Sequence, residues 1–91
     1  MTPNKFELDS DFATTVSMSV LEALLAEKER QLGVYGEQNH DDSWWSLITT
    51  DKNGDVAKEI FNRNDTKLFI ELVEVAATYL SWAESVRRRH K

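Results

Sequence analysis

Two glutamates three residues apart, Glu71 and Glu74, have apolar residues on both flanks. In a helix this spacing puts both carboxylates on one face. Burying two like charges is costly unless a cation joins them, and Mg²⁺ suits this role because it takes carboxylate oxygens while keeping several waters. Asp51 and Asp55 form a second acidic pair, with Glu59 one turn further. If the two segments pack as antiparallel helices, these side chains form an acidic cluster for a metal ion.

Both acidic patterns have a second interpretation. Carboxylates three residues apart are common on solvated helix surfaces, where Lys67 or Arg63 would pair with the two glutamates. The segment 51–55 (DKNGD) is similar to the first five positions of an EF-hand calcium loop. The match ends at Val56, where that loop needs glycine, so we do not expect a calcium site.

Composition limits the classes of protein to which the chain can belong. Its 91 residues suffice for one domain, and the absence of cysteine excludes disulfides, thiolate metal ligands and a cysteine nucleophile. Eleven Lys and Arg against sixteen Asp and Glu give a net charge of −5, which argues against a nucleic-acid partner. No apolar run approaches the roughly 20 residues of a membrane span, and no secretory signal pattern is visible. We therefore expect a cytoplasmic protein that does not enter a membrane.

One proline and three glycines predict an all-α fold, because hairpin-rich folds need more turn residues. We expect three main helices in an antiparallel bundle that oligomerisation completes. The expected divisions are a polar arm over 1–12, a single helical domain over 13–88 and a basic tail over 89–91, with helices from Ser19 to between Leu32 and Tyr35, from Ser43 to a turn at 62–65, and from Thr66 to Arg88. The expected caps are Ser19 with Glu22 in a capping box, Asp41 or Asp42, and Asn64 or Asp65.

The second and third helices depart from a simple amphipathic pattern. The ladder 48, 52, 56, 60 is apolar except at Lys52, where an apolar side chain is due. The third helix is apolar around most of its circumference, and its narrow polar stripe consists of Glu71, Glu74, Thr78, Ser81 and Ser85. A helix apolar on so many sides is buried on more than one side. Because three helices cannot cover it fully, we expect a partner subunit.

Two segments in order, EKERQLGVYGEQNHDDSWWSLITTDKNGDVAKEI and ELVEVAATYLSWAE, resemble the short MazG-like nucleotide pyrophosphohydrolases. The resemblance covers residues 19–86. The residues that match the family pattern are Glu29, Arg30, Tyr35, Gly36, Gln38, His40, Trp45, Ile48, Gly54, Asp55, Val56, Ala57, Glu71, Leu72, Val75, Ala76, Ala77 and Trp82.

The resemblance implies an all-α protein, working as a dimer or tetramer, that hydrolyses nucleoside triphosphates to the monophosphate and pyrophosphate. Family members hold Mg²⁺ with an E-x-x-E pair on one helix and an E-x-x-D pair on the next. Carried over to this chain, the second pair falls on Glu71 and Glu74, and the first falls on Lys52 and Asp55. Asp51 takes the place of a preceding glutamate. The implied ligands of Mg²⁺, or of Mn²⁺ in its place, are therefore Asp51, Asp55, Glu71 and Glu74.

Lys52 departs from the family pattern, because an ammonium group cannot coordinate a metal. Either the carboxylates still hold Mg²⁺ while Lys52 contacts a substrate phosphate, or Lys52 replaces the charge of the metal and leaves a weak or inactive relative. In the active case, Mg²⁺ bridges the phosphates while Glu71 or Glu74 orients or deprotonates the attacking water. The candidate catalytic residues are thus Glu71, Glu74 and Lys52.

Amide and aromatic side chains near the end of the first helix are candidates for contact with the nucleotide, because amides can read a base edge and aromatic rings can stack. They are Gln31, Tyr35, Gln38, Asn39 and Trp45. Alternatively, Tyr35 and Trp45 belong to the core, and Gln38 and Asn39 to a turn. In the doublet Trp44-Trp45 we expect one ring to face inward and the other to face an interface or pocket.

Three functions remain open at this stage. The first is Mg²⁺-dependent hydrolysis of a nucleoside triphosphate to monophosphate and pyrophosphate. The second is a catalytically weakened MazG-like relative that binds a nucleotide or a protein. The third is a small helical adaptor whose apolar third helix docks on another protein.

Overall fold

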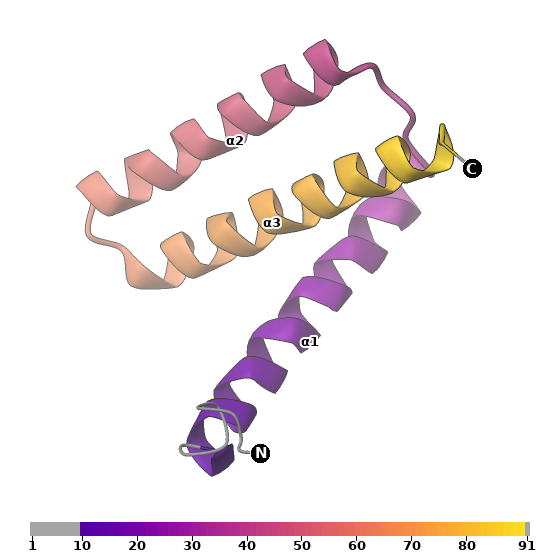
Figure 1. Ribbon diagram of the computed structural model, residues 1–91. Helices are drawn as coiled ribbons and strands as arrows, with labels where there is room; N and C mark the ends of the chain where they lie inside the picture. Colours follow the sequence, from indigo (N-terminus) through magenta and orange to yellow (C-terminus); the bar gives the residue numbers. More distant parts are fainter. Residues whose placement is uncertain (1–9, 91) are drawn as a thin grey trace.

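The computed structural model describes residues 10–90, and the side chains of residues 19–90 (Figure 1). Over that range the chain forms three helices and no strand: α1 (Ser10–Tyr35), α2 (Asp42–Phe61) and α3 (Asp65–Arg88). The all-α fold class is confirmed. None of these helices is long and apolar enough to cross a membrane.

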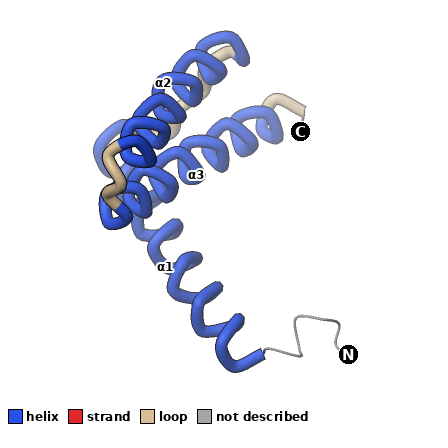
Figure 2. The backbone as a smooth tube through the Cα atoms, turned by 90° about the vertical axis from the view of Figure 1, so that its left-hand side faces the viewer, coloured by secondary structure: helices blue, strands red, loops and turns tan. Residues whose placement is uncertain are grey.

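Helix α3 lies between the other two and packs against both. The short turn after α2 makes α2 and α3 antiparallel neighbours along their whole length (Figure 1). Helix α1 meets α3 only through its C-terminal half, and its N-terminal half diverges from the hairpin (Figure 2). The backbones of α1 and α2 do not contact each other. The result is an open three-helix bundle in which α3 is the neighbour shared by α1 and α2.

The start of α1 differs from the prediction. The helix begins at Ser10 instead of Ser19, so Ser19 and Glu22 lie inside it and do not form a capping box. Threonine, valine and serine lower helix propensity only weakly, and extending an existing helix is far easier than nucleating one. Residues 10–12 of the predicted arm therefore belong to α1, whereas residues 1–9, and Lys91 of the predicted tail, lie outside the described range.

The other helix ends follow their capping residues. Asp41 is the N-cap of α2, and its side chain accepts a hydrogen bond from the backbone N–H of Trp44 at 2.9 Å. Asn64 is the N-cap of α3 and accepts from the backbone N–H of Lys67 at 3.0 Å. Both caps are confirmed, and both helices start within one residue of the prediction. After α1, Gly36 adopts a φ of 71°, the left-handed conformation in which glycine commonly ends a helix.

The core is small and lies where α2 meets the C-terminal half of α3. Trp45, Val75 and Ala77 are its buried apolar residues. The ring of Trp82 lies nearly parallel to that of Trp45, with centroids 6.5 Å apart, and its Nε1 donates to Asp42 at 2.9 Å. The expected division of the tryptophan doublet is confirmed, because Trp45 is 1% exposed and Trp44 is 50% exposed.

The doublet provides a matched test of where the stability of this fold resides. Trp45→Ala removes the largest fully buried side chain, so we expect a loss of about 3–5 kcal/mol in the free energy of unfolding. Trp44→Ala removes a half-exposed ring and should change that free energy by less than about 1 kcal/mol. Urea unfolding followed by circular dichroism measures both. Equal losses in the two variants would contradict this description of the core.

Candidate functional site

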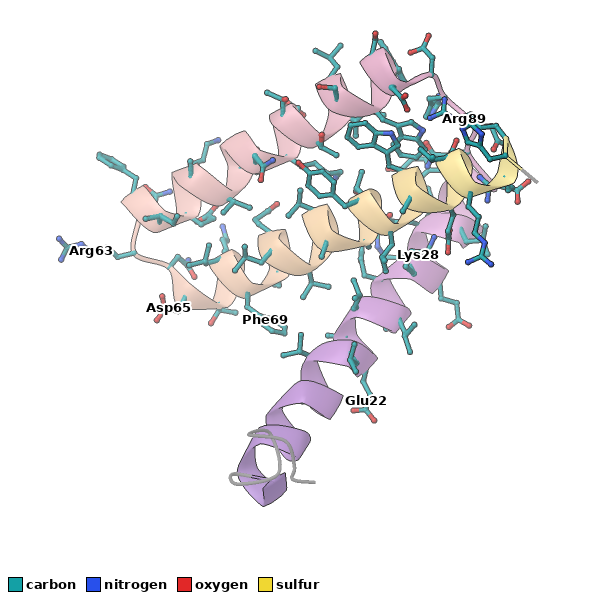
Figure 3. The ribbon with its side chains drawn as sticks, viewed as in Figure 1. Glu22, Lys28, Arg63, Asp65, Phe69 and Arg89 are labelled. Carbon is teal, nitrogen blue, oxygen red and sulfur yellow. The ribbon has the colours of Figure 1, made fainter. Side chains whose placement is uncertain are left out.

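The polar stripe of α3 faces the other two helices. Thr78 and Ser85 are buried, and the remaining three members are half-buried. Ser81 Oγ accepts a hydrogen bond from Lys28 Nζ on α1 at 2.9 Å, and Lys28 extends from α1 toward α3 (Figure 3). The stripe therefore faces inward, which agrees with the first of the two interpretations that the sequence pattern left open.

The carboxylates of α2 and α3 lie close enough to influence one another. Burial raises the pKa of the Glu71 carboxyl, and the negative charges of Glu74, Asp55 and Glu59 raise it further. Lys52 acts in the opposite direction. Glu71 and Asp55 thus belong to one electrostatic cluster, as the sequence predicts.

The ion pairs expected for a solvated edge are not found in the described part of the chain. Glu71 and Glu74 are half-buried, and no ion pair within residues 19–90 joins either of them to Lys67 or Arg63. Arg63 extends away from the bundle at the turn before α3 (Figure 3). The calcium-loop match fails as well, because residues 51–55 lie inside the continuous helix α2.

Lys52 and Asp51 lie on different sides of α2. The inward side of this helix carries Trp45, Thr49, Lys52, Val56 and Glu59, all buried or half-buried. Lys52 therefore lies on the inward side of α2, at the position where the sequence pattern predicts an apolar side chain. Successive helical residues point about 100° apart, so Asp51 is exposed on the outer side.

A metal ion fits this cluster only if the substrate contributes ligands. Within the part of the chain described, no three His, Cys, Asp or Glu side chains converge closely enough to hold a metal. Mg²⁺ commonly uses one or two protein carboxylates and takes the rest of its ligands from substrate phosphates and water. Asp55, Glu71 and Glu74 suit such a shared site, whereas Asp51 is not among the charged groups that act on Glu71.

A pocket of about 200 Å³, which we call the junction pocket, opens where the three helices and the loop after α1 meet. It is lined by Arg30, Gln31, Tyr35, Gln38, Trp45, Ile48, Lys52, Thr78 and Ser81. Four of the five predicted nucleotide contacts line this pocket, together with Lys52. Residues far apart in the sequence thus converge in one pocket.

Hydrogen bonds hold the α1 wall of the junction pocket in place. Gln31 Nε2 donates to Glu27 Oε2 at 2.8 Å and to the backbone carbonyl of Glu74 at 3.4 Å. Arg30 donates two hydrogen bonds to the same Glu27 carboxylate, at 2.9 and 2.7 Å. The hydrogen bond from Arg30 contributes most to lowering the pKa of the Glu27 carboxyl, with smaller contributions from Gln31 and Lys52. This wall is therefore built before any ligand arrives.

Asn39 does not line the junction pocket. Its Oδ1 accepts from Arg88 Nε at 2.9 Å, and Arg88 also donates to the backbone carbonyl of Gln38 at 2.9 Å. These bonds attach the loop to the end of α3, so Asn39 has the turn role that was its alternative interpretation. Gln38 Oε1 forms a hydrogen bond with His40 Nε2 at 2.8 Å, and Gln38 also lines the junction pocket.

Sequence reasoning missed several residues of this site. Thr78 and Ser81 line the junction pocket, and Glu27 holds its α1 wall. The spacing of the polar stripe contained the signal for the first two. A larger groove of about 500 Å³ adjoins the pocket, and two of its three lining cations are paired: Lys28 with Glu84 at 2.7 Å, and Arg88 with Glu37 at 3.3 Å.

Comparison of the chain with protein-family profiles, curated proteins and solved structures finds no match.

The raised pKa of Glu71 predicts a specific dependence of stability on pH. A carboxyl whose pKa is raised by folding binds its proton more tightly in the folded state, so folding stability falls as pH rises through that window. Glu71→Gln should therefore raise the melting temperature at pH 7 and leave it almost unchanged below pH 4. A gain of about 1 kcal/mol would correspond to roughly 4–8 °C in a domain of this size.

Thermal unfolding at both pH values measures the effect, and Asp51→Asn is the control because Asp51 is exposed. A lower melting temperature for Glu71→Gln at pH 7 would contradict the electrostatic cluster.

Proposed function

We propose that this protein is a MazG-like nucleoside triphosphate pyrophosphohydrolase, which converts an NTP or dNTP to the monophosphate and pyrophosphate with Mg²⁺ or Mn²⁺. The observation that carries the proposal is the position of Lys52. Its side chain lines the junction pocket, and its charge acts on Glu71 across the α2–α3 interface. A nucleotide whose nucleoside part enters the pocket would lead its phosphates past Lys52 toward the carboxylates.

The chain's own groups supply the remaining chemistry of this proposal. Lys52 binds phosphate oxygens and holds the triphosphate chain in place. Glu71 accepts the proton of the attacking water, and its raised pKa makes it a stronger base than an ordinary carboxylate. Asp55 and Glu74 would hold the metal ion, which would supply positive charge that offsets the charge of the phosphates.

The second candidate is a MazG-like relative that binds a nucleotide without hydrolysing it. Lys52 favours this function as well, because it already places a positive charge beside Glu71 and Glu27. A fixed ammonium offsets negative charge but does not activate water as a metal does. The two candidates therefore differ in whether bound nucleotide is cleaved.

A panel of NTPs and dNTPs, scored for pyrophosphate release with Mg²⁺, tests the two candidates. In the active case we expect release from at least one nucleotide and a fall of about 10-fold or more in kcat/KM for Lys52→Met, because a charge-assisted contact to phosphate is lost. Lys52→Glu should fall further through repulsion of the triphosphate. Asp51→Asn on the exposed side of α2 should remain active.

In the binding-only case, no nucleotide releases pyrophosphate, yet one raises the melting temperature. Saturation at about 100 times Kd stabilises a protein by roughly 2.7 kcal/mol, which a thermal shift detects readily. Lys52→Glu should then increase affinity for Mg²⁺, because it restores a carboxylate to the cluster. Inert nucleotides with no thermal shift would reject both candidates and leave the helical adaptor.

We further propose that the working form is a homodimer, or a homotetramer built from such dimers. Three large residues on the side of α3 away from the polar stripe form what we call the apolar face: Phe69, Leu72 and Leu80, which are 45%, 46% and 38% exposed. Phe69 extends outward from α3 (Figure 3). Helix α1 also carries the exposed leucines Leu21 and Leu25. A second copy would cover the apolar face.

Light scattering coupled to size exclusion tests this assembly. We expect the mass of a dimer or tetramer for the natural chain and a shift toward monomer for Phe69→Asp, because a charge on the apolar face opposes its burial. Leu47→Asp, on the outer side of α2, is the matched control and should keep the natural mass. A monomeric natural chain at micromolar concentration would contradict the proposal.

A further inference from the structure

The junction pocket contains a buried hydrogen-bond donor without a partner. Trp45 lines the pocket, is 1% exposed, and its Nε1 is the one buried side-chain nitrogen or oxygen in the described part of the chain that lacks a hydrogen bond. The neighbouring Trp82 differs, because its Nε1 donates to Asp42 at 2.9 Å. Buried donors in folded proteins nearly always have an acceptor, so this donor is available to a ligand in the adjoining pocket.

Two other groups of the pocket offer acceptors. Gln31 uses its Nε2 for Glu27 and the Glu74 carbonyl, so the atom that it can offer a ligand is Oε1. Thr78 Oγ1 donates to the same carbonyl at 2.9 Å, which leaves its lone pairs for a ligand. The pocket thus presents one unpaired donor and two acceptors within walls that Tyr35 and Ile48 help to form.

The size and polarity of the pocket select a small, neutral and planar group. At about 200 Å³ it is smaller than the roughly 300–1,000 Å³ typical of pockets that enclose a whole drug-sized ligand. A phosphate buried against the ring of Trp45 would lose the hydration of its charge, which is very unfavourable. A neutral heterocycle that carries both an acceptor and an N–H donor loses much less hydration free energy and can replace it with hydrogen bonds. Phosphates are better placed at Lys52, the half-buried cation of the lining.

We infer that the junction pocket reads the nucleobase, and that Trp45 does so by donating its Nε1–H to a ring nitrogen or carbonyl oxygen of the base. We assign Trp45 a hydrogen bond and not a stacking contact, because its ring is 1% exposed and already has Trp82 and the edge of His40 as neighbours. Trp45 is therefore a specificity-determining residue through one hydrogen bond. This inference rests on the proposed function in one respect, namely that the ligand is a nucleotide.

The indole N–H signals of the full chain provide a direct test. We would record ¹H–¹⁵N spectra while adding cytidine, uridine, adenosine or guanosine, without metal or phosphate. At least one nucleoside should move the Trp45 signal downfield and leave that of Trp82 in place, because Trp82 already donates to Asp42. Replacing Trp45 with benzothienylalanine keeps the ring shape, removes the N–H and assigns the signal. That variant should bind the same nucleoside roughly 3- to 10-fold more weakly.

The outcomes separate this inference from the proposed function. A shifted Trp45 signal without pyrophosphate release from any triphosphate supports base reading and rejects hydrolysis. Pyrophosphate release with an unmoved Trp45 signal, and with an unchanged KM in the benzothienylalanine variant, overturns base reading and keeps hydrolysis. A nucleoside that moves only the signal of the half-exposed Trp44, or four nucleosides that move none, also overturns it.

Discussion

The orientation of α3 about its own axis is the constraint on which the candidate site depends. Its polar stripe faces α1 and α2, and large residues of its apolar face remain exposed. Burying the stripe is tolerable because α1 supplies partners: Lys28 donates to Ser81, and Gln31 donates to the carbonyl of Glu74. Burial of polar groups contributes little to folding by itself. A second copy on the apolar face would add the hydrophobic contribution that a chain of 91 residues otherwise lacks.

Lys52 connects the two halves of the proposed site. It extends into the junction pocket and offsets part of the negative charge around Glu71 and Glu27. The half-buried carboxylates nevertheless oppose folding at neutral pH, since Glu71 holds its proton more tightly than usual. Such a cost is characteristic of functional sites, where groups are kept for chemistry although they reduce stability. The orphan donor of Trp45, which lines the junction pocket, is a second instance.

Local sequence signals predicted the local features well. Asp41 and Asn64 begin α2 and α3 because their side chains bind backbone N–H groups within the next three residues, which requires no tertiary context. The start of α1 was wrong because a weakly unfavourable stretch does not end a helix that can propagate through it. Gln31, Gln38 and Trp45 were predicted together because amides and aromatic rings suit contact with a nucleotide, and the structure brings these residues to one pocket.

The sequence by itself determined which side chains share a face of each helix, because residues per turn are the same in every α-helix. It therefore predicted the polar stripe of α3 and the lone Lys52 of the α2 ladder. Only the tertiary structure decided how each helix is rotated against its neighbours. That rotation buries the stripe, exposes Asp51 while Asp55 stays near Glu71, and ties Asn39 to Arg88. The helical period fixes the angles between side chains on one helix. The packing of the helices against one another decides which of those side chains face inward.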